Sequence, residues 1–345
     1  MKNNKKVSIY DIAKIAGVSS ASVSYVINGK GKVGEKTRQR ILKAMEQTGY
    51  TPDTTAVTLS TGKSNLVGLC LPFKDASEAF VNNPFYGEFL GYFEKEMMKE
   101  GYDVIVGSLM EAKDFTKWVK SRKLEGIVMM GLFPSEIYTA VQKLDISVAL
   151  VDVYESYSPS FKNIRVDDRG GAYKATSYLI EQGHRNIGFI GGDIDNSLVD
   201  DMRFAGYLDA LKEHGIELDP SLVYKIPATF DGGYEIAEEI ASRIDRMSAV
   251  VCAADIIAIG VIRRLNELGH KIPDELSIVG FDDIQAARYI YPALTTVHQS
   301  IREKGRLSAL TILNQLKGIE LEDIGATVIT KTSLVIRQSV KNIKK

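Results

Sequence analysis

Uncharged hydrogen-bonding side chains gather between Ser8 and Asn28 at spacings that could present them on one face of a helix. The stretch reads SIYDIAKIAGVSSASVSYVIN and holds two short apolar-patterned segments separated by Gly17-Val18-Ser19. Hydroxyl, amide and aromatic groups in such an array suit reversible hydrogen bonding to a polar surface. The positions expected to point outward from the second segment are Ser20, Ala21, Ser22, Ser24, Tyr25 and Asn28.

Two helices are needed to position these side chains. Ser8 can cap the first, with Asp11 completing a capping-box-like start, and Ser19 can cap the second. Gly17 permits the tight corner between them. Such a pair is a helix-turn-helix, whose second helix can enter a DNA major groove, although a plain helical hairpin has the same local pattern. The residues expected to face inward are Ile12, Ala13, Ile15, Ala16, Val23, Val26 and Ile27.

No constellation for catalysis is visible in the sequence. The glycine run Gly188–Gly192 is not G-x-G-x-x-G and has no P-loop lysine. Cys70 and Cys252 lie in apolar, strand-like runs without metal-ligand spacing, as small core residues do. We therefore expect neither an enzyme nor a bound metal or cofactor. The histidines are scattered at His184, His214, His270 and His298.

Charge is unevenly distributed along the chain. The net charge is −1, yet residues 1–63 carry eleven Lys or Arg against four Asp or Glu. A basic head on an acidic body is typical of a separate polyanion-binding module. No apolar run approaches the ~18 residues of a membrane span, and the first residues lack an apolar segment, so we expect a cytoplasmic, nucleoid-associated protein.

The chain predicts a small helical head, a connector and a large α/β core. A third helix with Ile41, Leu42 and Met45 on one face would complete a DNA-binding domain over residues 1–50, and the polar residues 51–63 would form a hinge. From residue 64 to about 340, two successive series of strands alternate with amphipathic helices. This pattern predicts two lobes, each a doubly wound parallel sheet, with a ligand cleft at the carboxyl ends of the strands.

Blocks spread over almost the whole chain resemble the LacI/GalR family of transcriptional regulators. They include Asn83-Pro-Phe-Tyr86, Val166-Asp167-Asp168, Arg203-Phe-Ala-Gly206-Tyr207 and Gly280-Phe-Asp-Asp283, and the resemblance runs from about Val7 to Ser339. The resemblance implies a helix-turn-helix head, a hinge and a periplasmic-binding-protein-like core that senses a small molecule. It also implies an N-lobe of about 64–164 with 296–325 and a C-lobe of about 165–295 with 326–340.

The resemblance implies which residues contact DNA. Ser20, Ala21 and Tyr25 would face base edges, and because none is arginine, direct readout should be modest. In the hinge, Leu59 matches the leucine that relatives push into the minor groove, and Ala56 matches the small residue before it. The expected phosphate partners, which set register without reading sequence, are Ser8, Tyr10, Ser19, Ser22, Ser24, Asn28 and Thr37.

The resemblance also implies an effector site between the lobes. Asp282 and Arg203 match a carboxylate and a guanidinium that can each grip two hydroxyls, Phe230 matches a stacking aromatic, and Asp255 could be either an effector contact or a helix cap. The positions expected to line the N-lobe wall are Tyr86 and Asp152. A sugar or sugar phosphate is the favoured effector, with a nucleobase as the alternative.

Two functional hypotheses therefore stand. The first is a regulator, a repressor of carbohydrate-utilisation genes, that binds a pseudo-palindromic operator as a homodimer because one head reads only a half-site. Its effector would shift the population of lobe arrangements and so change operator affinity. The second is a solute-binding sensor whose head contacts proteins. Steep loss of affinity as salt rises would distinguish the DNA binder.

Overall fold

The computed structural model describes residues 7–28, 33–52, 58, 60, 62–73, 76–154, 161–192, 198–319 and 327–344. No helix within these segments is long and apolar enough to cross a membrane. The chain divides into two compact units. The first holds residues 1–65 together with 121–125, and the second holds the remainder of the chain.

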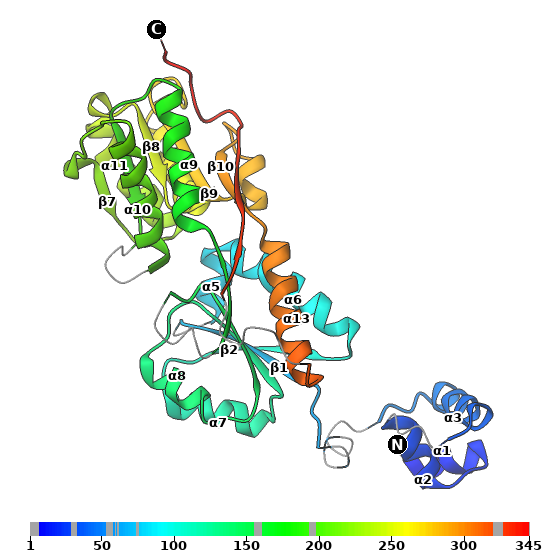
Figure 1. The fold of residues 1–345 in the computed structure, drawn as a ribbon. Coiled ribbons are helices and arrows are strands. Elements are labelled where there is room, and N and C mark those ends of the chain that lie inside the picture. Colours follow the sequence, from blue (N-terminus) through cyan, green and yellow to red (C-terminus); the bar gives the residue numbers. More distant parts are fainter. Residues whose placement is uncertain are drawn as a thin grey trace. The chain divides into compact units, whose positions relative to one another are not determined.

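Three helices form the head: α1 (Ile9–Ala16), α2 (Ser20–Ile27) and α3 (Glu35–Thr48), drawn in blue in Figure 1. The predicted capping box is present, since Ser8 Oγ accepts from Asp11 N and Ser8 N donates to Asp11 Oδ2 at 2.9 Å. Ser19 Oγ accepts from Ser22 N at 3.1 Å and so caps α2. Gly17 ends α1 in the left-handed region at φ +63°, as the tight corner requires.

The head core is built around Ile12, Val23 and Ile41, which are fully buried. Val26 and Ile27 pack against it partly buried, as expected. The prediction was wrong for Ile15 and Leu42, which are 53% and 40% exposed. At ~100° per residue, each lies on the flank of its helix rather than on the inner face.

The N-lobe contains a six-stranded parallel sheet in the order β11-β5-β4-β3-β1-β2. Helices α6 and α13 pack against each other and on this sheet. The strands are β1 (Leu66–Leu71), β2 (Asp103–Ser108), β3 (Gly126–Met130), β4 (Ser147–Val151), β5 (Lys162–Val166) and β11 (Thr327–Thr330). The helices are α5 (Ala76–Asn82), α6 (Pro84–Lys99), α7 (Ala112–Arg122), α8 (Ser135–Val141) and α13 (Ile301–Leu316).

The C-lobe contains a second six-stranded sheet in the order β12-β10-β9-β8-β6-β7. It is parallel except that β12 runs antiparallel to β10. Helices α9 and α10 pack as one pair and α11 and α12 as another. The strands are β6 (Ile187–Gly191), β7 (Val223–Lys225), β8 (Ala249–Cys252), β9 (Ser277–Asp282), β10 (Thr295–Gln299) and β12 (Thr332–Val335). The helices are α9 (Asp168–Glu181), α10 (Leu198–Glu213), α11 (Phe230–Ser242) and α12 (Asp255–Glu267).

The chain passes between the lobes three times, after β5, after β10 and between β11 and β12 (Figure 1). Two of these crossings differ from the expected boundaries. Strand β10 belongs to the C-lobe sheet, although residues from about 296 were expected in the N-lobe, and β11 belongs to the N-lobe sheet, although residues from about 326 were expected in the C-lobe. Both strands are short and contain two Thr residues each, so their hydrophobic pattern does not indicate which sheet they join.

Candidate functional site

Four of the residues expected to contact DNA, Tyr10, Ser19, Ala21 and Tyr25, are exposed on the head. Ala21 and Tyr25 are exposed one turn apart on α2, Ser20 is half-buried beside them, and Tyr10 is 73% exposed. Thr37 is half-buried on α3. An array of small groups around one tyrosine is compatible with close approach of a duplex.

Several of the predicted phosphate partners already make hydrogen bonds inside the head. The hydroxyls of Ser8 and Ser19 are used in helix caps, and that of Ser22 lies 3.0 Å from Ser19 Oγ. Asn28 Nδ2 donates to Ser24 Oγ at 3.1 Å and to Ser60 Oγ at 3.0 Å. These side chains therefore position α2 in addition to any contact with phosphate. Ala56 and Leu59 lie outside the described residues.

The core contains a cavity of about 300 Å³ at the carboxyl ends of strands from both sheets. Its N-lobe lining follows β1, β3 and β4 and includes Tyr86 and Asp152, and its C-lobe lining includes Arg203, Asp282 and Gln299. Parallel sheets place loops and helix starts at this edge, which is why ligand sites form there. The aromatic part of the lining consists of Phe73, Phe85, Tyr86 and Tyr154.

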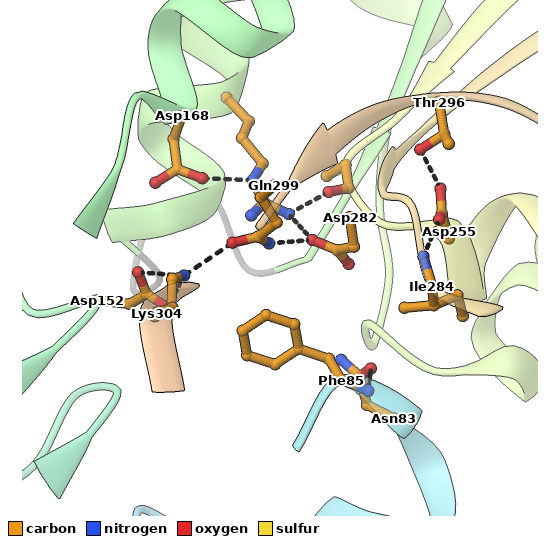
Figure 2. A network of polar contacts seen from close by, with 12 residues as sticks. Asn83, Phe85, Asp152, Asp168, Asp255, Asp282, Ile284, Thr296, Gln299 and Lys304 are labelled. Carbon is orange, nitrogen blue, oxygen red and sulfur yellow. Dashed lines mark hydrogen bonds and ion pairs between the residues drawn. The ribbon is translucent and has the colours of Figure 1, made fainter. Parts of the chain in front are cut away.

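A ring of polar side chains borders this cavity and joins the lobes (Figure 2). Lys304 Nζ contacts Asp152 Oδ1 and Oδ2 at 2.9 and 2.7 Å and donates to Gln299 Oε1 at 2.7 Å. Gln299 Nε2 donates to Asp282 Oδ1 at 2.6 Å. Arg203 then lies 3.4 Å from Asp282 Oδ1 through Nη1.

The ring closes through two further residues. Arg203 Nε donates to Asp168 Oδ1 at 2.8 Å, and the hydroxyl of Tyr154 donates to Asp168 Oδ2. Tyr154 stands two residues after Asp152, in the N-lobe, so the ring starts and ends on the same loop. Asp152 and Asp282 have φ values of 56° and 113°, which non-glycine residues rarely adopt. Such backbone conformations concentrate at functional sites.

Two polar atoms of ring residues that line the cavity have no partner among the described residues. Arg203 uses Nε and Nη1, the latter donating to Ala253 O at 2.5 Å, and has no partner for Nη2 among the described residues. Asp282 uses Oδ1 and has no partner for Oδ2 within the same part of the chain. A guanidinium donor and a carboxylate acceptor on two paired side chains can together bind neighbouring hydroxyl groups.

Negative charge exceeds positive charge in the ring. Three carboxylates, Asp152, Asp168 and Asp282, face two cations, Arg203 and Lys304, and Lys304 is fully buried with its ammonium engaged by ring oxygens. Burial raises the pKa of Asp282 to about 6, although the Arg203 guanidinium lowers it. Burial likewise raises the pKa of Asp152 against the opposing effect of Lys304. The site therefore disfavours a further negative charge.

Comparison with known proteins identifies the chain. Residues 8–53 match the family described as bacterial regulatory proteins, lacI family, and residues 176–340 match a periplasmic binding protein-like domain. The chain is 30% identical over 341 residues to the ribose operon repressor of Haemophilus influenzae, covering 97% of this chain and 98% of that protein. The chain belongs to the lacI family.

Solved lacI-family structures have the same fold. The lac repressor dimer bound to operator superposes with a TM-score of 0.82 at 22% identity, covering 98% of this chain and 100% of that one. The cellobiose complex of the regulator CelR gives 0.73 at 24% identity, covering 96% and 99%. These two structures share the fold, and membership of the lacI family makes this chain a DNA-binding transcriptional regulator with an effector domain and not an enzyme. The hypothesis of a head that contacts proteins in place of DNA is set aside.

Four of the six residues expected to contact the effector line the cavity of this lacI-family core: Tyr86, Asp152, Arg203 and Asp282. Phe230 does not, because it starts α11 and packs half-buried against the core, and Ala228 of the same loop lines the cavity instead. Asp255 is fully buried behind the site, where its carboxylate accepts from Thr296 Oγ1 at 2.5 Å and Ile284 N at 3.0 Å (Figure 2).

Sequence reasoning missed four members of the ring: Tyr154, Asp168, Gln299 and Lys304. Asp168 was within a block that resembles the family but was given no role. The signal for Lys304 was present, since it stands among buried positions of an amphipathic helix, where an unpaired lysine is rare. Nothing local singles out Gln299 or Tyr154. Among the described residues, no cluster of His, Cys, Asp or Glu has a metal-binding arrangement.

Proposed function

We propose that this lacI-family regulator represses carbohydrate-utilisation genes and that its effector is a neutral sugar bound in the core cavity. The observation that carries the proposal is that Arg203 and Asp282, an ion pair lining the cavity through Nη1 and Oδ1, each keep one atom without a partner among the described residues, Nη2 as a donor and Oδ2 as an acceptor, in a ring with excess negative charge. Two neighbouring sugar hydroxyls can accept from the guanidinium and donate to the carboxylate. Phe85 and Tyr86 offer apolar faces to the sugar ring.

The charge balance argues against the sugar phosphates that the family resemblance allows. A phosphate would need unpaired cationic donors, yet Lys304 is saturated and Arg203 already faces two carboxylates. The lining also contains Asp152, Asp200 and Asp282, which would repel an anion. The cavity volume of about 300 Å³ lies at the lower end for small-molecule sites and favours a small sugar. The relatives named for ribose and cellobiose support a carbohydrate in general terms.

We further propose that two chains bind a pseudo-palindromic operator in the cytoplasm as a homodimer. The solved lac repressor is a dimer bound to operator. One helix-turn-helix head covers a single half-site, so twofold symmetry in the DNA requires twofold symmetry in the protein. A change in lobe arrangement would connect sugar binding to operator binding, because the ring that a sugar would contact also joins the two lobes. A ligand shifts that equilibrium only by its difference in affinity for the two arrangements.

Thermal-shift screening of the full chain against neutral sugars, their phosphates and nucleobases tests the effector class. We expect stabilisation by at least one neutral sugar, none by its phosphate, and a changed operator affinity in a gel shift with the same sugar. Stabilisation by a nucleobase or a sugar phosphate, and by no neutral sugar, would contradict the proposal. The variant Asp282→Asn, which keeps the shape of the side chain, should lose the response.

A further inference from the structure

Helix α7 of the core carries a basic face that the functions described so far do not use. Lys113, Lys117 and Lys120 recur at spacings of four and three residues, which places them on one side of the helix. Arg122 and Lys123 continue the run at its end. All five side chains are exposed. The side opposite Lys113, Lys117 and Lys120 buries Phe115 and Val119 against the lobe, and Arg122 and Lys123 lie at the end of the helix. Below, these five residues are called the α7 basic face.

The α7 basic face gathers several exposed cations in one short stretch of the core. Some exposed cations elsewhere are matched by carboxylates, as in Lys99–Glu96, Lys317–Glu100 and Arg306–Glu303, at 2.6–2.7 Å, whereas Lys95, Lys143 and Lys212 stand singly and exposed. Within the part of the chain that the structure describes, none of the five makes an ion pair within 4.0 Å. They also stand on a core whose residues from 64 onward carry more acidic than basic side chains. Unpaired positive charge on an acidic body calls for a polyanionic partner.

The position of α7 along the chain links this face to the DNA-binding head. Ser64 Oγ donates to Lys123 O at 2.6 Å, and Asn65 N donates to Glu125 Oε1 at 2.6 Å, so the end of the connector is bound to the end of α7. Only residues 51–63 separate this point from the head. Thirteen residues span at most about 45 Å when fully extended. The connector is therefore long enough to allow one duplex to contact both the head and the α7 basic face.

We propose that the α7 basic face binds the phosphate backbone of the same duplex that the head reads, as a second, sequence-independent contact made by the core. The inference rests on the DNA-binding function of the head. Lysines on a helix surface suit this contact because each releases condensed counterions when it neutralises a phosphate. The contact adds affinity and salt dependence but no sequence preference. It compensates for a head whose base-facing positions Ser20, Ala21 and Tyr25 carry no charge.

The test compares two charge reversals in the full chain. The variant Lys117→Glu/Lys120→Glu alters the α7 basic face, and Lys212→Glu/Lys271→Glu makes the same change of charge at exposed positions of the C-lobe. Binding is measured by fluorescence anisotropy over a range of salt concentrations. The probes are an operator selected from random duplexes by the wild-type chain and a random-sequence duplex.

We expect the α7 variant to bind both duplexes more weakly by the same factor, on the order of tenfold. The slope of log affinity against log salt should fall in magnitude by about 0.9 for each lost lysine–phosphate contact, up to about 3.6 for a dimer. The C-lobe variant should keep the wild-type slope. Equal slopes and affinities for the two variants would overturn the proposal, and so would a loss confined to the operator. Failure of the wild-type chain to bind any duplex would instead refute the DNA-binding function itself.

A second measurement uses the single tryptophan of the chain, Trp118, which lies on α7 next to Lys117. Iodide, an anion, should quench its fluorescence less in the wild-type complex with DNA than in the free protein, because phosphates would occupy the α7 basic face. The C-lobe variant should show the same protection. Equal quenching of Trp118 by iodide in the wild-type complex and in the free wild-type protein would contradict contact between DNA and the α7 basic face.

Discussion

Asp282 is the ring member whose ionisation affects both stability and binding. Burial raises its pKa to about 6 from an ordinary value of 3.8, so the folded chain binds this proton more tightly than the unfolded chain does. Stability from this group is therefore greatest below pH 3.8 and decreases as pH rises to about 6. Effector affinity should change in the opposite direction and rise with pH. The Asp282 carboxylate must be ionised for Oδ2 to accept a hydrogen bond from a sugar hydroxyl.

We predict that sugar affinity falls by up to about tenfold per pH unit below pH 6 and is constant above it. Calorimetric titration from pH 5 to 8 measures this dependence. In Asp282→Asn the affinity should be weak and independent of pH. Asp209→Asn is the matched control, because Asp209 lies exposed on α10, where the hydrogen bond from Arg169 lowers its pKa. Equal pH profiles for the wild type and Asp282→Asn would refute the role of this carboxylate.

Lys304 is a fully buried cation whose removal leaves Asp152 without its counter-charge. Lys304→Met should lower the free energy of unfolding by about 3–5 kcal/mol, because the remaining carboxylate stays buried and unpaired. Urea denaturation measures the loss. Lys317→Met, which breaks the exposed pair with Glu100, should cost less than about 1 kcal/mol. Similar costs for the two variants would show that the ring does not stabilise the core.

At the scale of elements, two adjacent serines in the head have different roles. Ser19 caps α2 through Ser22 N, whereas Ser20 makes no cap and lies beside Ala21 on the face expected to meet DNA. Ser19→Ala should destabilise the head by about 1 kcal/mol and weaken binding to all duplexes alike. Ser20→Ala should leave the melting temperature unchanged and alter preference at a single base-pair position. Melting curves and binding to a panel of single-base operator variants separate the two outcomes. The same change in melting temperature and in base preference for both variants would contradict these separate roles of Ser19 and Ser20.

At the scale of the whole molecule, the hinge must transmit the state of the core to the head. Leu59 lies outside the described residues, and its role rests on the family resemblance. Leu59→Ala should weaken operator binding while sugar affinity stays unchanged, because it removes a side chain expected to enter the minor groove. Anisotropy with the selected operator measures the first and calorimetry the second.

Leu42→Ala is the matched control for the hinge variant, since Leu42 is an exposed leucine on α3 of the head. It should leave operator affinity within a factor of about two, as most surface substitutions do. Coupling between two binding sites is reciprocal. If sugar changes operator affinity by a certain factor, operator must change sugar affinity by the same factor. An unchanged operator affinity in Leu59→Ala would remove the hinge from this coupling.

The sequence alone was sufficient for features that depend on neighbouring residues. Ser8, Asp11, Gly17 and Ser19 produce the predicted caps and corner because a cap is formed within three residues of chain. The alternation of strands and helices, and with it the two-lobed α/β core, followed from hydrophobic periodicity, and the order of blocks was enough to indicate the family. The lobes to which β10 and β11 belong did not follow, because these strands are short and are defined by their partners.

Only the tertiary structure decided which polar groups meet. Lys304 and Asp152 are 152 residues apart in sequence, and Arg203 and Asp168 are 35 apart, yet each pair is in hydrogen-bond contact. Phe230 and Asp255 were also expected near the ligand, Asp255 with a helix cap as its alternative. In the structure Phe230 packs on the core, and the Asp255 carboxylate accepts from Thr296 and Ile284. Periodicity tells which side of an element is buried. It does not tell which buried groups lie opposite one another, because that depends on how distant strands pair and where the chain crosses between sheets.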